Sequence, residues 1–322
     1  MRRDKGPGKD VVCIKILCVG LMVCDLLIKP VTEEALRSDC VQAEAIRMLV
    51  GGDAFNVASN LAALGTEADL FSAVGKDTFG AFALDYAEKL GVSAKWIETA
   101  DGPTSVTAVL IHPDGERNFV VQRGASHEIS EDRVSDDLIQ EYDLLYIGSA
   151  CGIPGLDGEG LTRLLQRAKA LGRLTAMDIT GNPAKEAVSQ LLPALPYLDY
   201  FLPSSYEAMA LSGRETPEEA ADYFHQQGVP VVAVKLGSQG ALLSYGKRQK
   251  RFPAFEGPVV DTTGAGDAFV SGFLSALGRG EPLSGCVQMG NGAGTVCVGK
   301  LGSSGTLPSY EELVSLTGIH GS

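Results

Sequence analysis

The stretch Val259-Val-Asp-Thr-Thr-Gly-Ala-Gly-Asp-Ala-Phe269 joins a short apolar run to a series of small residues. Apolar side chains then recur at helical spacing, at Phe269, Phe273, Leu274 and Leu277. This order places Gly264, Ala265 and Gly266 at the N-terminus of a helix. There, the free N–H groups and the positive end of the helix dipole favour an anion.

Asp267 follows these small residues in the first turn of the predicted helix. Small residues let a phosphate approach the backbone closely, and a neighbouring carboxylate can accept a proton from a hydroxyl that attacks the phosphate. A lone Gly-x-Gly-Asp would more often be a glycine turn with an aspartate cap. The complete stretch over residues 261–267 instead favours phosphoryl transfer, with Asp267 as the catalytic base and Gly264, Ala265 and Gly266 as the anion site.

Short apolar runs and helical periods alternate on the N-terminal side of this stretch. The helical periods end at Gly65 and Gly91, as glycine C-caps commonly do. The apolar runs cover residues 14–19, 68–74, 144–147, 174–177, 200–202 and 229–234. Such alternation predicts an α/β fold: a three-layer, Rossmann-like domain with a central, mostly parallel sheet.

Two segments, at about residues 22–50 and 96–124, interrupt this alternation. The second contains two strand-like runs around His112-Pro-Asp-Gly115, and an Asp-Gly pair is a strong hairpin signal. We expect both segments to form a small β-structured lid on a single domain that covers residues 11–322. Trp96, the only tryptophan, is expected at the hinge of this lid, and the alternative is a static core tryptophan beneath it. Residues 1–10 are expected to be a disordered leader.

The composition restricts the partners and the compartment. The net charge of −13 argues against a nucleic-acid binder, and the nearest candidate for a basic patch, residues 247–251, is interpreted as a solvated hairpin turn. Seven cysteines without a Cys-x-x-Cys pair indicate a reducing compartment, so we expect a cytoplasmic protein. Lys15 and Asp25 interrupt the apolar run near the N-terminus, so we expect neither a signal peptide nor a membrane span there.

Two glycine-rich stretches in this order, Gly51-Gly-Asp-Ala-Phe-Asn56 and residues 261–267, resemble the two signatures of the ribokinase-like (PfkB) family of carbohydrate and nucleoside kinases. Val74-Gly-Lys-Asp-Thr-Phe-Gly80 and Val234-Lys-Leu-Gly237-Ser-Gln-Gly240 resemble further elements of that family. The resemblance covers almost the whole chain after the first ten residues. It implies ATP-dependent phosphoryl transfer to a sugar hydroxyl, with the amides of residues 264–267 around the transferred group.

The resemblance also implies where the two substrates bind. The residues expected around the sugar are Asp25, Gly51, Gly52, Asp53, Asn56 and Arg123. The residues expected around ATP are Lys235, Gly237, Ser238, Gly240 and Asn291. Asp53 stands where many ribokinases carry a lysine, which argues against ribose as the substrate. Asn291 could instead be a polar helix residue that faces solvent, and Arg123 a surface arginine.

For metal ions, the resemblance implies Mg²⁺ and a monovalent cation. Glu207 is retained from the family's Asn-x-x-Glu element and is expected to hold Mg²⁺ through water, although Ser204 replaces the asparagine. Asp261 and Thr263 match the site of a monovalent cation, for which K⁺ is expected.

The predicted function is therefore transfer of the γ-phosphoryl group of ATP to a terminal hydroxyl of a small sugar, a ketohexose or another furanose-type sugar. A nucleoside kinase or a ribokinase of the same family is the alternative within this class. A catalytically silent sugar-binding regulator is the alternative from another class. We expect small-molecule partners, no nucleic acid and no membrane, and a homodimer formed through the lid.

Overall fold

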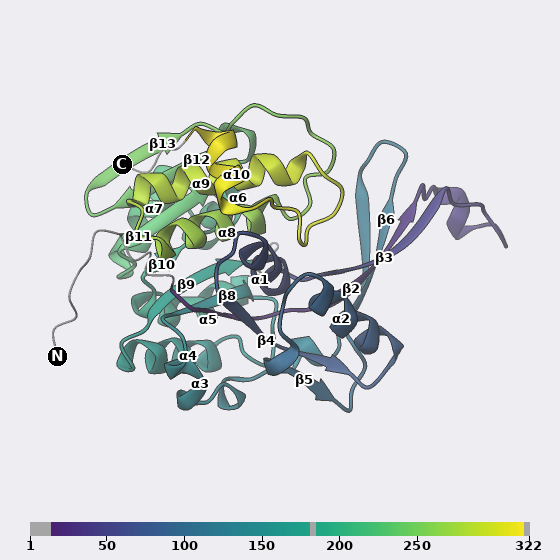
Figure 1. Ribbon diagram of the computed structural model, residues 1–322, viewed down its shortest axis with the longest axis horizontal. Coiled ribbons are helices and arrows are strands. Elements are labelled where there is room, and N and C mark those ends of the chain that lie inside the picture. The colour runs from purple at the N-terminus through teal and green to yellow at the C-terminus, as the bar shows by residue number, and fades with distance from the viewer. Residues whose placement is uncertain (1–13, 181–184, 319–322) are drawn as a thin grey trace.

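The computed structural model describes residues 14–180 and 185–318 and shows a layered α/β body with a small sheet projecting from one side (Figure 1). The body contains a nine-stranded sheet. In spatial order its strands are β5 (Ile97–Ala100), β4 (Ala68–Gly75), β1 (Ile16–Val19), β8 (Leu144–Ala150), β9 (Leu174–Ile179), β10 (Tyr200–Phe201), β11 (Val231–Lys235), β12 (Ala241–Tyr245) and β13 (Arg248–Phe252). Neighbours from β5 to β11 are parallel, and β12 pairs antiparallel with both β11 and β13.

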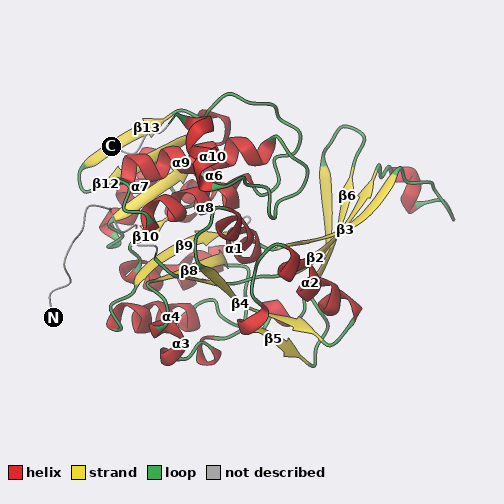
Figure 2. Cartoon of the chain, in the orientation of Figure 1, coloured by secondary structure: helices red, strands yellow, loops and turns green. Residues whose placement is uncertain are grey.

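Helices cover both faces of this sheet (Figure 2). One face is covered by α1 (Asp53–Ala63), α2 (Thr78–Lys89), α8 (Ala265–Gly278), α9 (Leu283–Val298) and α10 (Tyr310–Thr317). The other is covered by α3 (Asp136–Gln140), α4 (Glu159–Ala170), α5 (Lys185–Leu191), α6 (Ser205–Ser212) and α7 (Pro217–Gln226). The predicted three-layer arrangement with a mostly parallel sheet is confirmed.

The central strand β1 shows why the two cores form. Its side chains alternate between the faces, so Ile16 and Cys18 pack into one apolar cluster and Leu17 and Val19 into the other. All four are fully buried, and burial on both faces is what makes such a strand read as a continuous apolar run in the sequence.

The projecting sheet has four strands, in the order β3 (Ala45–Gly51), β2 (Val23–Lys29), β6 (Val106–Ile111) and β7 (Arg117–Gln122) (Figure 1). We call it the lid. Its β6–β7 hairpin closes where predicted, and the amide of His112 donates to the carbonyl of Glu116 at 2.8 Å.

Strand register separates the two faces of the lid. Asp25 pairs with Thr107, which pairs with Val121, and side chains two residues along a strand share a face. Asp25, Phe119 and Arg117 therefore lie on one face, which we call the inner face because it carries Asp25. Ile46 and Val120 lie on the opposite, outer face.

The structure departs from the sequence analysis at the start of the second lid segment. Residues 97–100 form β5, which extends the large sheet beside β4 instead of joining the lid. Trp96 ends a short 3₁₀ helix (Ala94–Trp96) just before that strand, and its indole N–H donates to the hydroxyl of Tyr142 at 2.9 Å. The prediction of a lid hinge at Trp96 was wrong, because the tryptophan packs against the large sheet.

The leader predicted for residues 1–10 lies outside the described residues. Within the described part of the chain, no helix combines the length and the apolar character that crossing a membrane requires.

Candidate active site

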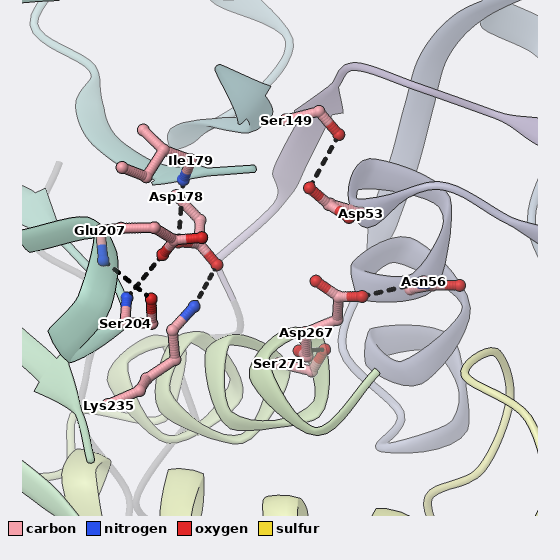
Figure 3. Close-up of polar contacts among 10 residues, drawn as sticks. All are labelled: Asp53, Asn56, Ser149, Asp178, Ile179, Ser204, Glu207, Lys235, Asp267 and Ser271. Atoms are coloured by element: carbon pink, nitrogen blue, oxygen red, sulfur yellow. Dashed lines mark hydrogen bonds and ion pairs between the residues drawn. The ribbon is translucent and has the colours of Figure 1, made fainter. Parts of the chain in front are cut away.

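The site lies at the carboxyl edge of the parallel sheet, where α1 and α8 begin. Polar side chains from both helices and from the ends of β8, β9 and β11 meet there (Figure 3). They surround a cavity of about 510 Å³. Its lining includes Asp53, Asp178, Ser204, Glu207, Lys235, Gly264, Gly266 and Asp267. Ligands of open α/β sheets commonly bind at this edge.

Asp267 lies in the first turn of α8, as predicted, and is buried. Its Oδ2 accepts a hydrogen bond from Nδ2 of Asn56 at 2.7 Å (Figure 3). Oδ1 of Asn56 in turn accepts from Oγ of Ser303 at 3.1 Å. Burial and the neighbouring carboxylate of Asp53 raise the pKa of Asp267 well above its ordinary value, and the Asn56 bond partly opposes this rise. The buried amide of Asn56 therefore positions the candidate base.

Gly264 is the N-cap of α8 and has a left-handed conformation with φ of 75°. A Cβ at this position would lie 2.5 Å from Cβ of Ser303, so only glycine fits the turn. The first amides of a helix have no carbonyl partner within the helix. In this turn, Gly266 and Asp267 line the cavity, where an anion could accept from their amides.

Across the cavity, Lys235 at the end of β11 forms an ion pair with Oδ2 of Asp178 at the end of β9 (Figure 3). Burial raises the pKa of Asp178 to about 7 even though the lysine opposes this. Burial likewise disfavours the charge of Lys235, but Asp178 and Glu207 outweigh it and raise the pKa of the lysine. One largely buried ammonium thus faces several carboxylates.

The lid side of the site is also acidic. Asp25 lies on the inner face of the lid, and burial together with Asp53 raises its pKa to about 7. Asp53 begins α1 and accepts from Oγ of Ser149 at 2.9 Å. Gly51 is the last residue of the lid strand β3, and a Cβ there would lie 2.4 Å from Oδ2 of Asp25, so a larger side chain would displace this carboxylate. Gly52 is the N-cap of α1.

A second cavity, of about 640 Å³, adjoins the first and shares Lys235, Gly237 and Gly266 with it. Its lining includes Ser238, Gly240, Ala254, Phe255, Phe269, Asn291 and Val298. Asn291 is buried and its Nδ2 donates to the carbonyls of Phe252 and Pro253, each at 3.0 Å. It therefore does not face solvent, and it fixes a wall of an apolar pocket large enough for a planar base.

Three comparisons with known proteins agree with this geometry. The model of the pfkB family of carbohydrate kinases matches residues 14–309. The chain belongs to the pfkB family of carbohydrate kinases. An uncharacterized sugar kinase of Archaeoglobus fulgidus is 30% identical over 77% of this chain and 98% of its own length. The crystal structure of a ribokinase from Thermotoga maritima has a TM-score of 0.79 and 26% identity, covering 95% of this chain and 100% of that one.

An ATP-dependent 6-phosphofructokinase of Thermoanaerobacterium thermosaccharolyticum is 26% identical over 94% of this chain and 93% of its own length. These relatives are named for different substrates. The comparisons therefore identify the family of this chain but not its substrate. The predicted resemblance and the kinase class are confirmed.

The other predicted site residues of this pfkB kinase differ in their placement. Glu207 borders the first cavity and forms a capping box with Ser204, whose amide donates to its Oε2 at 2.7 Å. Arg123 is exposed beyond the end of β7, and its charge acts on His127 and Asp157. It is not among the residues that line the two cavities.

Asp261 and Thr263, the residues predicted to hold a monovalent cation, contact an arginine of the lid instead. Arg117 from the lid donates to Oδ1 of Asp261 at 2.6 Å and also to Oγ1 of Thr263. Every side-chain oxygen that would ligate a cation already accepts a hydrogen bond, because Oδ2 of Asp261 accepts from the amide of Gly302 at 3.1 Å.

Sequence reasoning missed three residues of the site: Asp178, Ser149 and Arg117. Asp178 follows a predicted buried strand directly, and a polar residue at the carboxyl end of a parallel strand is the signal that could have found it. Ser149 has a left-handed φ of 66° within β8, which no sequence pattern reveals. Arg117 contacts residues more than 140 positions away.

The raised pKa of Asp25 predicts a pH-dependent stability. An ordinary carboxyl has a pKa of 3.8, so as the pH rises the unfolded chain ionises Asp25 before the folded chain, whose pKa is about 7. The free energy of unfolding therefore falls between these values. Asp25→Asn cannot ionise, so it removes this loss of stability. The substitution should raise the melting temperature at pH 8 by roughly 2 °C or more, and by less at pH 4.

Thermal unfolding of the two proteins at both pH values measures this effect. Asp85→Asn, at an exposed position on α2, is the matched control and should change neither value. An equal shift at both pH values would contradict a raised pKa for Asp25.

Proposed function

We propose that this kinase transfers the γ-phosphoryl group of ATP to a terminal hydroxyl of a small furanose-type sugar, a ketohexose in the first place. One observation carries the proposal: the Asn56 amide holds the buried carboxylate of Asp267 at the start of α8, beside two adjoining cavities. The apolar cavity suits an adenine, and the polar cavity suits the phosphates and the acceptor hydroxyl.

Asp267 would accept the proton of the attacking sugar hydroxyl. The amides at the start of α8 and the ammonium of Lys235 would stabilise the negative charge of the transferred group, since preorganised donors are the main device of such catalysis. Asn56 would act as a positioning residue, because its contacts are with Asp267 and Ser303. In this proposal Asn56 supports the base and does not contact the sugar.

The carboxylates of Asp25 and Asp53 support a polyhydroxylated acceptor. Each can accept from sugar hydroxyls, as carboxylates do at up to four lone-pair positions. Gly51 and Gly52 would let the sugar approach the backbone between them, and Arg123 stays a proposal for an outer contact. Relatives of similar identity are named ribokinase, cytidine kinase and 2-dehydro-3-deoxygluconokinase, so a ribokinase or nucleoside kinase is the alternative within the family.

The site also suits ATP with Mg²⁺. Mg²⁺ keeps several waters and commonly takes only one or two carboxylates beside substrate phosphates. Glu207 and Asp178 border the cavity and would hold it in this way, and the described residues offer no group of three or more acidic, His or Cys side chains placed to hold a metal. When bound, Mg²⁺ neutralises charge on the phosphates. Potassium is left out of this proposal because Arg117 already contacts both Asp261 and Thr263.

An ATP-consumption assay over a panel of ketohexoses, aldoses, ribose and nucleosides tests the proposal. We expect the highest kcat/KM for a ketohexose, with a product that carries phosphate on a terminal hydroxyl. Turnover only with ribose or nucleosides would favour the alternative within the family. Saturable sugar binding without turnover of any member would favour a catalytically silent sugar-binding regulator.

Asp267→Asn should retain sugar and ATP binding and lose kcat by about 10²–10⁴, the contribution of a positioned base. Steady-state kinetics combined with calorimetry separates the two effects. Asp85→Asn is the control for an aspartate outside the site and should keep the wild-type rate. A kcat for Asp267→Asn within a few-fold of the wild type would remove the base from the mechanism.

We also propose a homodimer through the outer face of the lid, in a reducing compartment such as the cytoplasm. The outer face exposes apolar side chains, with Ile46 at 63% and Val120 at 61%. Val120→Lys should therefore convert a dimer into a monomer in sedimentation experiments. Leu316→Lys, at an equally exposed leucine of α10, is the control. A monomeric wild-type protein would contradict the dimer.

A further inference from the structure

Arg117 is the first residue of β7 and lies on the inner face of the lid, next to the β6–β7 turn. Its guanidinium spans Asp261 and Thr263, donating to both side chains. The ion pair is largely shielded from water, with exposed fractions of 25% for the Arg117 side chain and 7% for that of Asp261. A planar guanidinium with parallel donors suits such two-point contact with oxygen acceptors.

The lowered pKa of Asp261 is consistent with a positive charge that the protein itself supplies, the guanidinium of Arg117. Burial alone would raise the pKa of Asp261, but hydrogen bonds from Thr263 and Gly302 and the charge of Arg117 together lower it below the ordinary value. Oδ1 of Asp261 accepts from the amide of Thr263 at 2.9 Å and from its hydroxyl at 2.7 Å, in addition to Arg117. The carboxylate is thus ionised and fully supplied with donors.

The position of this ion pair connects it to the candidate reaction centre. Thr263 directly precedes Gly264, and Asp261 lies three residues before it; the left-handed turn at Gly264 begins α8. The amide of Gly302 holds the other oxygen of Asp261, and neighbouring Ser303 packs on Gly264 and bonds Asn56. The charge on Asp261 and the shape of the amide turn therefore depend on the same few contacts.

We propose that Arg117 is a built-in cation, a positioning residue whose guanidinium takes the place of the monovalent cation expected between Asp261 and Thr263. The proposal rests on the phosphoryl-transfer function proposed above. It implies that turnover is independent of K⁺, and that the amide turn is complete only while the lid holds Arg117 against it. In this proposal, Arg117 of the lid occupies the position where the sequence predicted K⁺.

The first test compares the wild-type protein in KCl and in tetramethylammonium chloride at equal ionic strength. We expect equal rates of ATP consumption and equal melting temperatures in the two salts. A rate or a melting temperature that rises specifically with K⁺ would overturn the proposal. The melting temperature reports cation binding without turnover, so it remains informative if the sugar-kinase proposal itself fails.

The second test removes the guanidinium. Arg117→Ala should lower kcat about tenfold or more in tetramethylammonium, as loss of a preorganised charge contact does. Adding K⁺ or low millimolar guanidinium should restore most of that rate and raise the melting temperature of the variant. Arg117→Lys should retain part of the rate without added cation.

A matched control is Arg248→Ala, at an exposed arginine of β13, which should keep the wild-type rate and show no response to K⁺. Loss of activity in Arg117→Ala without any cation response in rate or melting temperature would assign Arg117 a purely structural role in the lid and overturn the proposal. An unchanged rate in Arg117→Ala would overturn it as well.

Discussion

The central constraint of this structure is the burial of several carboxylates around one ammonium at the carboxyl edge of a parallel sheet. Asp53, Asp178 and Asp267 come from three separate elements, and Lys235 pairs directly with only one of them. Burying an unpaired charge is costly, and the raised pKa values of these carboxyls express that cost. A ligand that brings hydroxyl donors or a cation-bound phosphate would lower this free-energy cost. The buried carboxylates therefore favour binding of such a ligand.

The fold offsets part of this cost through its helices. Asp53 begins α1 and Asp267 lies in the first turn of α8, so both carboxylates lie where the helix dipole favours negative charge. The two helices pack against each other on the same face of the sheet, and the hydrogen bond between Asn56 and Asp267 joins their first turns. The same packing that buries the apolar core thus fixes the geometry of the candidate base.

Features of the site that depend on adjacent residues could be predicted from the sequence, and features that depend on long-range packing could not. The anion turn at Gly264 and the place of Asp267 follow from seven consecutive residues and a helical period. The ion pair of Lys235 with Asp178 joins residues 57 positions apart, and only the order of strands in the sheet brings them together. The same holds for Trp96, whose partner Tyr142 is 46 positions away.

The lid connects two parts of the candidate site through one small sheet. Its inner face carries Asp25, a candidate partner of the sugar, and Arg117, which contacts the residues before the amide turn. Both groups belong to one hydrogen-bonded sheet, so a displacement of the lid moves them together. On our proposal, a lid that moved away from the sugar would also withdraw the positive charge of Arg117 from Asp261, and the turn at Gly264 would lose that support. Such a coupling would make the phosphoryl site complete only when the acceptor is enclosed, which limits the hydrolysis of ATP by water.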